Sequence, residues 1–85
     1  MFTATDNIAQ SIQVLSELAQ EQGVPKSVQI RILGITKILE EPNGEPSIRV
    51  NRALNALEEL ADENHLPSFA RSQVFSVLGL LAAVH

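Results

Sequence analysis

Three arginines in the second half of the sequence have the side chains best suited to bind another molecule: Arg49, Arg52 and Arg71. Each guanidinium group offers N–H donors in a flat fork that fits phosphate and carboxylate oxygens. Arg49 and Arg52 are three residues apart, so on a helix they lie on one face. The three arginines could therefore bind an anion such as a nucleic-acid phosphate, or they could pair with acids of this chain or of another subunit.

Acidic neighbours favour pairing. The acids nearest to Arg49 and Arg52 in the sequence are Glu40, Glu41 and Glu45. Arg71 lies within plausible reach of Glu59 or Glu63 across a predicted corner. Because a cation near a helix N-terminus is electrostatically unfavourable, each arginine needs such a partner. We expect pairing within or between chains to account for most of this set.

A carboxylate cluster in the stretch EELADE is the other candidate for chemistry. It consists of Glu58, Glu59, Asp62 and Glu63. These groups could bind a metal, and a small enzyme that uses Glu59 with Asp62 or Glu63 is one hypothesis. However, the chain has no Cys and only two His, which leaves little material for a zinc site or a nucleophilic triad. We therefore expect no enzyme, no cofactor and no metal, and we expect His65 to form only local hydrogen bonds.

Composition limits the remaining possibilities. The chain has 85 residues, 45% of them hydrophobic, and a formal net charge of −4, which disfavours nucleic acid as the main partner. The N-terminal residues lack the basic start and apolar run of a signal peptide. The most apolar stretch, residues 74–84, is well short of the roughly 20 residues needed to cross a bilayer. The composition predicts a cytoplasmic protein with no membrane partner.

The segments that must position these residues belong to a sequence repeat. When 14–39 is aligned with 56–81, 42 residues later, seven of the 26 pairs are identical and others keep their apolar character. The identical pairs are Leu15/Leu57, Glu17/Glu59, Leu18/Leu60, Ala19/Ala61, Glu21/Glu63, Pro25/Pro67 and Leu39/Leu81. Each copy reads as a helix end, a tight corner, and a proline that opens the next helix.

Hydrophobic residues recur with helical spacing on both sides of each corner. The spacing predicts helices over about 6–21, 25–40, 46–64 and 67–84, with a linker over 41–45 that contains the breakers Pro42 and Gly44. We therefore expect one all-α domain over 1–85, a four-helix bundle. It is built from two antiparallel αα-hairpins, about 6–40 and about 46–84, in an up-and-down topology.

The helix predicted over 67–84 has more apolar side chains than one buried stripe needs. One interpretation makes this helix and the one over 25–40 central, touching each other where Gly34 and Ser76 allow a close crossing. The alternative is that part of the last helix faces a second subunit, with Phe75, Leu78 and Ala82 in the contact. So small a bundle can hardly hide all of these side chains.

The stretch RVNRALNALEELADENHLPSFARSQVF resembles the signature of an archaeal group, uncharacterised protein family 0147. The matching positions are Arg49, Val50, Leu57, Glu59, Asn64, Pro67, Ala70, Arg71 and Phe75. Phe75 stands where the family usually has Trp, and the first half echoes a family motif through Val24 and Pro25, with Lys26 a departure and Arg31 displaced. The resemblance implies a small bromodomain-like four-helix bundle and no established function. It implies no acetyl-lysine binding, since the chain has no Tyr or Trp.

The sequence names no partner, ligand or pathway. The leading hypothesis is a non-enzymatic helical protein-interaction module, a homo-oligomer (dimer) that self-associates through the last helix, or a module for another protein partner. The candidate contacts are Arg49, Arg52, Arg71, Phe75, Leu78 and Ala82. The alternative is a nucleic-acid-associated accessory protein that uses the three arginines, and a small enzyme is the third.

Overall fold

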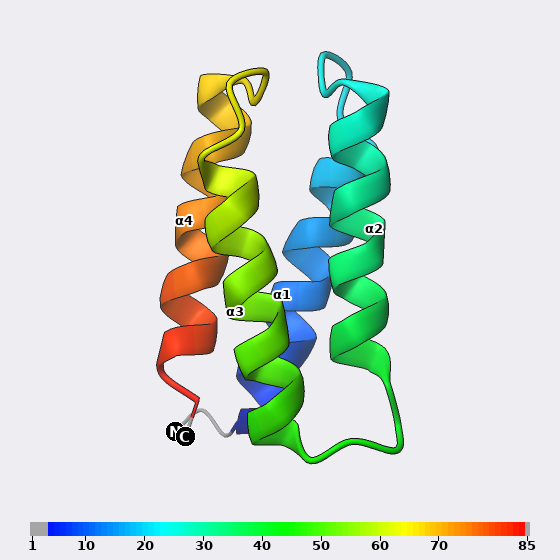
Figure 1. Ribbon diagram of the computed structural model, residues 1–85, viewed down its shortest axis with the longest axis vertical. Helices are drawn as coiled ribbons and strands as arrows, with labels where there is room; N and C mark the ends of the chain where they lie inside the picture. Colours follow the sequence, from blue (N-terminus) through cyan, green and yellow to red (C-terminus); the bar gives the residue numbers. More distant parts are fainter. Residues whose placement is uncertain (1–3, 85) are drawn as a thin grey trace.

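The computed structural model describes the backbone of residues 4–84 and the side chains of residues 6–84. These residues form four helices and no strand (Figure 1). The helices are α1 (Ala4–Ala19), α2 (Lys26–Glu40), α3 (Pro46–Ala61) and α4 (Ser68–Ala82). The expected all-α, four-helix fold is confirmed, whereas the closer likeness to bromodomains stays a prediction.

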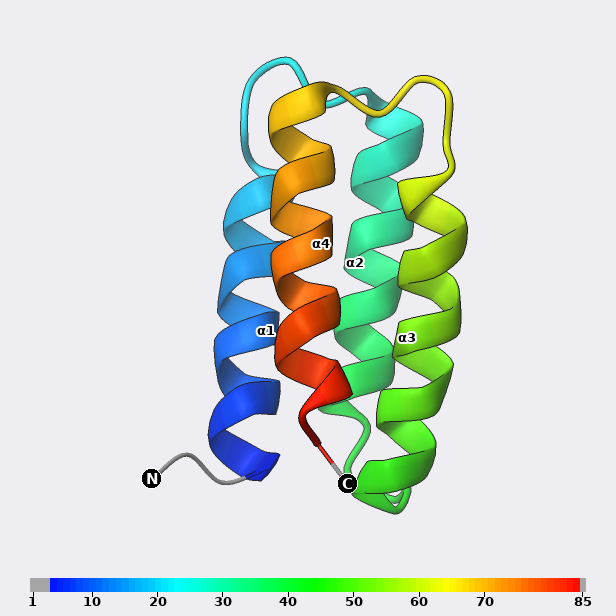
Figure 2. The same ribbon diagram turned by 90° about the vertical axis from the view of Figure 1, so that its left-hand side faces the viewer.

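The helices form a ring in which each one packs on two neighbours. α1 contacts α2 and α4, and α3 contacts the same two helices. Figures 1 and 2 show that the chain runs up and down, so neighbours are antiparallel and both described ends of the chain lie at one end of the bundle. α2 and α4 therefore occupy diagonally opposite corners.

This arrangement overturns the expected crossing of α2 and α4 at Gly34 and Ser76. Both residues are exposed, and a Cβ added at Gly34 would meet nothing within 4 Å. The physical reason is that the ring gives every helix one buried stripe and one open face. The apolar side chains beyond that stripe, Ile30 and Phe75 among them, lie on the surface instead of between two central helices.

The core follows the sequence repeat residue by residue. Of the 19 hydrophobic residues buried among residues 6–84, all but Ala53 form pairs that are 42 residues apart, and the counterpart of Ala53 is the buried Ser11. The pairs are Ile8/Val50, Leu15/Leu57, Leu18/Leu60, Ala19/Ala61, Val24/Leu66, Val28/Ala70, Ile32/Val74, Ile35/Val77 and Leu39/Leu81. The duplicated pattern thus specifies a core of two equivalent halves.

The corner prolines lie one residue before the helices that they open. Pro25 and Pro67 have extended backbones, with ψ of 148° and 152°, and their carbonyls accept the N–H of Gln29 and Arg71, each at 2.9 Å. α1 and α3 end at Ala19 and Ala61, earlier than the expected 21 and 64. After α1 the chain turns through Gly23, whose φ of 92° is a left-handed conformation that glycine adopts readily.

Candidate interaction surfaces

Arg49 lies near the start of α3 and reaches back to the end of α2. Its Nη1 donates hydrogen bonds to the carbonyls of Leu39 at 2.9 Å and Glu41 at 2.8 Å. The last carbonyls of a helix have no partner within the helix, so Arg49 closes this helix end. The sequence predicted Glu41 as one possible partner, but the bond is to its backbone and not to its carboxylate.

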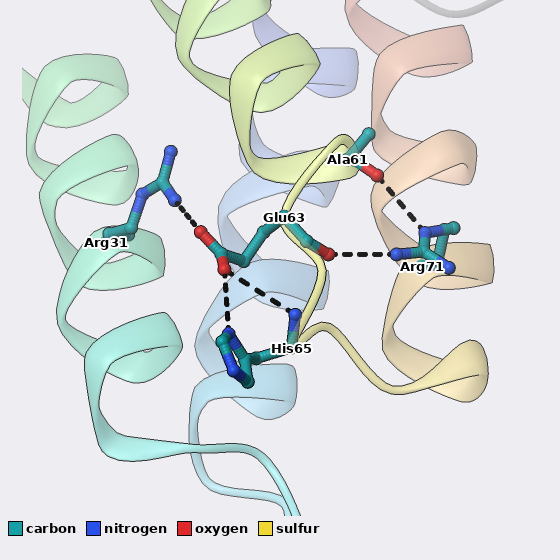
Figure 3. A network of polar contacts seen from close by, with 5 residues as sticks. All are labelled: Arg31, Ala61, Glu63, His65 and Arg71. Carbon is teal, nitrogen blue, oxygen red and sulfur yellow. Dashed lines mark hydrogen bonds and ion pairs between the residues drawn. The ribbon is translucent and has the colours of Figure 1, made fainter.

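Arg71 does the same at the next corner (Figure 3). Its Nε donates to the carbonyl of Ala61 at 3.1 Å and its Nη2 to the carbonyl of Glu63 at 2.9 Å. In both cases the acceptors lie ten and eight residues before the arginine. The expected neighbour Glu63 is confirmed, although here too the backbone is the acceptor.

Asn7 closes a third helix end. Its Nδ2 donates to the carbonyl of Leu80 near the end of α4, at 3.0 Å. Asn7 stands 42 residues before Arg49, so the repeat places the two residues at equivalent positions. The residue equivalent to Arg71 is Gln29, whose side chain makes no hydrogen bond within residues 6–84. Three helix ends are therefore each tied to the next helix around the ring.

The three predicted arginines do not gather into one site. Arg49 and Arg52 lie at the end of the bundle where α3 begins, and Arg71 lies at the opposite end, where α4 begins (Figure 1). Arg52 is exposed and has no hydrogen-bond or ion-pair partner within the described side chains. Arg49 and Arg71 direct their donors at backbone carbonyls. Only Arg52 is left with all its donors available to a ligand.

A small polar network surrounds Glu63 at the corner between α3 and α4 (Figure 3). Its carboxylate forms an ion pair with Arg31 of α2 at 3.0 Å and lies 3.1 Å from Nδ1 of His65. The hydrogen bond with the His65 side chain, followed by that from its backbone N–H, lowers the pKa of Glu63 from its ordinary value. The predicted local role of His65 is confirmed.

The predicted carboxylate cluster does not assemble into a metal site. Within the described side chains, no group of three or more His, Cys, Asp or Glu residues could hold a metal ion. The same part of the chain contains no helix that is both long and apolar enough to cross a membrane.

α4 lies at the front of the bundle in Figure 2. The residues on its outward face carry no charge. The residues of this face are all exposed: Ser68, Ser72, Phe75, Ser76, Gly79 and Ala82, together with Ala83, which directly follows the helix. We call these residues the α4 face. By contrast, the exposed faces of the other three helices carry charges such as Glu17 on α1, Lys37 on α2 and Glu58 on α3.

Of the three residues that the sequence predicts for a contact on the last helix, two lie on the α4 face. Phe75 is 56% exposed and Ala82 is exposed, so both lie on this face. Leu78 is only partly exposed and packs against the core. The serines and Gly79 were missed as candidates, although they follow Phe75 and Ala82 at helical spacing and could have been found from it.

Beside the α4 face, a shallow hollow runs along the contact between α1 and α4. It has a volume of about 680 Å³. Its lining is also uncharged, and consists of Asn7, Gln10, Val14, Ser76, Gly79, Leu80 and Ala83. The hollow shares Ser76, Gly79 and Ala83 with the α4 face, so the two form one continuous uncharged surface.

Comparison with known proteins places the chain in a family. The family model described as "Uncharacterised protein family (UPF0147)" matches residues 1–84. The chain belongs to this family. UPF0147 proteins similar to it come from archaea, and their family remains uncharacterised by its own description.

Two UPF0147 relatives show the extent of the similarity. The protein of Thermococcus kodakarensis is 30% identical over 78 residues, covering 91% of this chain and 94% of the relative. That of Pyrococcus furiosus is 29% identical over 85 residues, covering 99% of this chain and 91% of the relative. Each relative is thus matched over most of its length.

A solved structure shares the fold. The crystal structure of a protein of unknown function, MMP1188, superposes with a TM-score of 0.89 at 17% sequence identity, covering 95% of this chain and 92% of the other. At this identity the likeness concerns the fold alone.

Proposed function

We propose that this UPF0147 protein is a non-enzymatic helical interaction module that pairs with a second copy of itself through the α4 face. The observation that carries the proposal is the absence of charge on the exposed face of α4, where Phe75 leaves 56% of its surface in solvent. Burying exposed apolar surface is favourable by roughly 25 cal/mol per Å². A partner for this face therefore gains stability without separating any charge from water.

Charge favours a second copy as the occupant. The chain has ten acidic and six basic residues, so two copies repel each other in most orientations. At the α4 face this repulsion is smallest, because no like charges are brought into direct contact. Small side chains such as Gly79 and Ala82 also leave room for the Phe75 ring of the other copy.

The contact has to extend beyond α4. A stable protein–protein interface buries roughly 800 Å² from each partner, more than seven mostly small side chains provide. The adjoining hollow between α1 and α4 supplies further uncharged surface. We therefore place the second copy across the α4 face and this hollow together.

The test is the molecular mass in solution of three proteins. Sedimentation equilibrium at micromolar concentration should show the parent chain as a dimer and Phe75→Glu as a monomer, because the variant would bury an unpaired carboxylate in the contact. Ile48→Glu is the matched control, since Ile48 on α3 is 53% exposed and lies outside the α4 face. It should remain a dimer. A monomeric parent chain, or a Phe75→Glu variant that still dimerises, would contradict the proposal.

The arginine-based alternative, a nucleic-acid accessory protein, has less support. It needs guanidinium groups that are free to reach phosphates, and Arg49 and Arg71 instead hold helix ends. Arg52 alone keeps its donors available. Nucleic-acid binding that weakens steeply with salt, and that Arg52→Ala reduces, would favour this alternative.

A further inference from the structure

A second exposed surface lies on α2, diagonally opposite α4. Four residues follow one line along its solvent face: Lys26, Ile30, Leu33 and Lys37. We call them the α2 stripe. Ile30 is 61% exposed and Leu33 is 47% exposed. Positions i, i+4, i+7 and i+11 lie on the same side of a helix, so two aliphatic side chains stand between two ammonium groups.

The lysines of the stripe have charges that the fold does not use. Of the six Lys and Arg residues, Arg31 pairs with Glu63, and Arg49 and Arg71 bind carbonyls. Within the described side chains, Lys26 and Lys37 have no hydrogen-bond or ion-pair partner. They are the only lysines in a chain whose net charge is −4. The stripe is therefore a basic and apolar line on an acidic protein.

The α2 backbone is accessible beside the stripe. Gly34 is exposed, and a Cβ added to it would meet nothing within 4 Å. It borders a hollow of about 270 Å³ between α2 and α3 whose lining includes Ile38, Ala56 and Glu59. Arg52 and Lys37 line the next hollow along the same two helices. A side chain of a docked partner could thus lie against α2, with Glu40 and Glu59 as the acids at the border.

We propose that the α2 stripe docks an acidic helix of another protein. That helix would carry two apolar residues between two carboxylates with the spacing of the stripe, which reads the same in both directions and extends for about 16 Å. Its carboxylates would pair with Lys26 and Lys37, while its apolar residues would cover Ile30 and Leu33. The amphipathic partner helix thus complements the stripe in both charge and shape.

A second copy of this chain fits the stripe less well. The exposed face of α1 has Asp6 and Glu17 at the same separation of eleven residues as the two lysines. Between them stand Gln10 and Gln13, at the positions that would oppose Ile30 and Leu33. Such a contact would leave the aliphatic side chains without apolar cover. An anionic lipid surface also fits poorly, because two lysines attach weakly to a bilayer.

The test uses the full-length protein labelled with ¹⁵N and a synthetic alanine-based helical peptide. Within a twelve-residue segment of the peptide, positions 1 and 12 are Glu and positions 5 and 8 are Leu, which reproduces the spacing of the stripe. Addition of the peptide should shift the amide signals of residues 26–37 in NMR spectra. Ile30→Ser/Leu33→Ser should abolish the shifts, and Lys26→Gln/Lys37→Gln should weaken binding by about tenfold, as expected for two exposed ion pairs. Circular dichroism checks that the variants keep their helices.

A control separates the local charges from the net charge. Asn51→Asp/Asn55→Asp, at two exposed positions of α3 outside both the α2 stripe and the α4 face, lowers the net charge by the same two units as Lys26→Gln/Lys37→Gln, and it should leave peptide binding unchanged. Equal weakening by both double variants would overturn the proposal, as would the absence of shifts at millimolar peptide. Shifts of residues 26–37 caused by anionic phospholipid vesicles but not by the peptide would point to a membrane surface instead. If dilution of the protein without peptide changes the amide signals of residues 26–37, the stripe contacts a second copy of the chain instead.

Discussion

At the scale of single residues, the arginines have a structural role that the sequence indicated only in part. The sequence placed Arg71 within reach of Glu63, and that proximity is confirmed. It could not show that the acceptors are carbonyls, because helix ends expose backbone groups only once the chain has turned back on itself. The recurrence of acceptors ten and eight residues before Arg49 and Arg71 becomes visible only in the structure.

Removal of one of these caps should destabilise the protein. We expect Arg71→Ala to lower the free energy of unfolding by about 1–3 kcal/mol, because two carbonyls lose charge-assisted hydrogen bonds. Urea denaturation followed by circular dichroism measures this change. Arg52→Ala is the control, since Arg52 is exposed and without a partner in the described side chains, and its effect should stay within about 0.5 kcal/mol. Equal effects of the two variants would rule out a capping role for Arg71.

Glu63 gives the stability a dependence on pH. Its pKa in the folded state is lowered from 4.5, first by the hydrogen bond with His65. A lowered folded-state pKa stabilises the protein at pH values above the unfolded-state pKa, and this contribution disappears as the pH falls through the folded-state value. The melting temperature of the parent chain should therefore exceed that of Glu63→Gln near neutral pH. The difference should shrink towards pH 3, and a constant difference would contradict this assignment.

At the scale of the helices, the repeat and the helical spacing of its apolar residues account for most of the core. Residues at equivalent positions, such as Leu15 and Leu57, are buried to the same extent because the same periodic pattern places them on the inner stripe. The packing partners of each helix could not be predicted, because periodicity shows which face is apolar and not which helix covers it. For that reason the crossing that the sequence predicts at Gly34 is wrong, and the residue lies on an open face.

Gly34 should accept a larger residue. Gly34→Ala should stabilise the protein by about 1 kcal/mol, the difference in helix propensity between the two residues, because the added Cβ meets open space. The melting temperature by circular dichroism measures the change. Gly23→Ala is the contrast: there φ is 92°, so the same substitution should destabilise. If Gly34→Ala is less stable than the parent chain, Gly34 is in close contact with another part of the protein, and the assignment to an open face is wrong.

At the scale of the whole molecule, the fold depends on a pattern that many sequences can satisfy. MMP1188 shares only 17% of its residues with this chain, yet the two structures agree closely. Such agreement is expected where apolar periodicity and short corners decide the topology. The surfaces are harder to predict, because nothing in a single helix pattern shows which apolar residues, such as Phe75 and Ile30, remain outside the ring.

The diagonal placement of α2 and α4 has a consequence for assembly (Figure 2). Two chains joined at α4 would turn their α2 helices away from each other, so the pair would be a bivalent adaptor. A target that displays two acidic helices at the matching separation would bind both α2 stripes of the pair. The second binding step would be intramolecular and would therefore occur at a high effective concentration. The dimer would then bind such a target with a higher overall affinity than either bundle alone, although each single contact is weak.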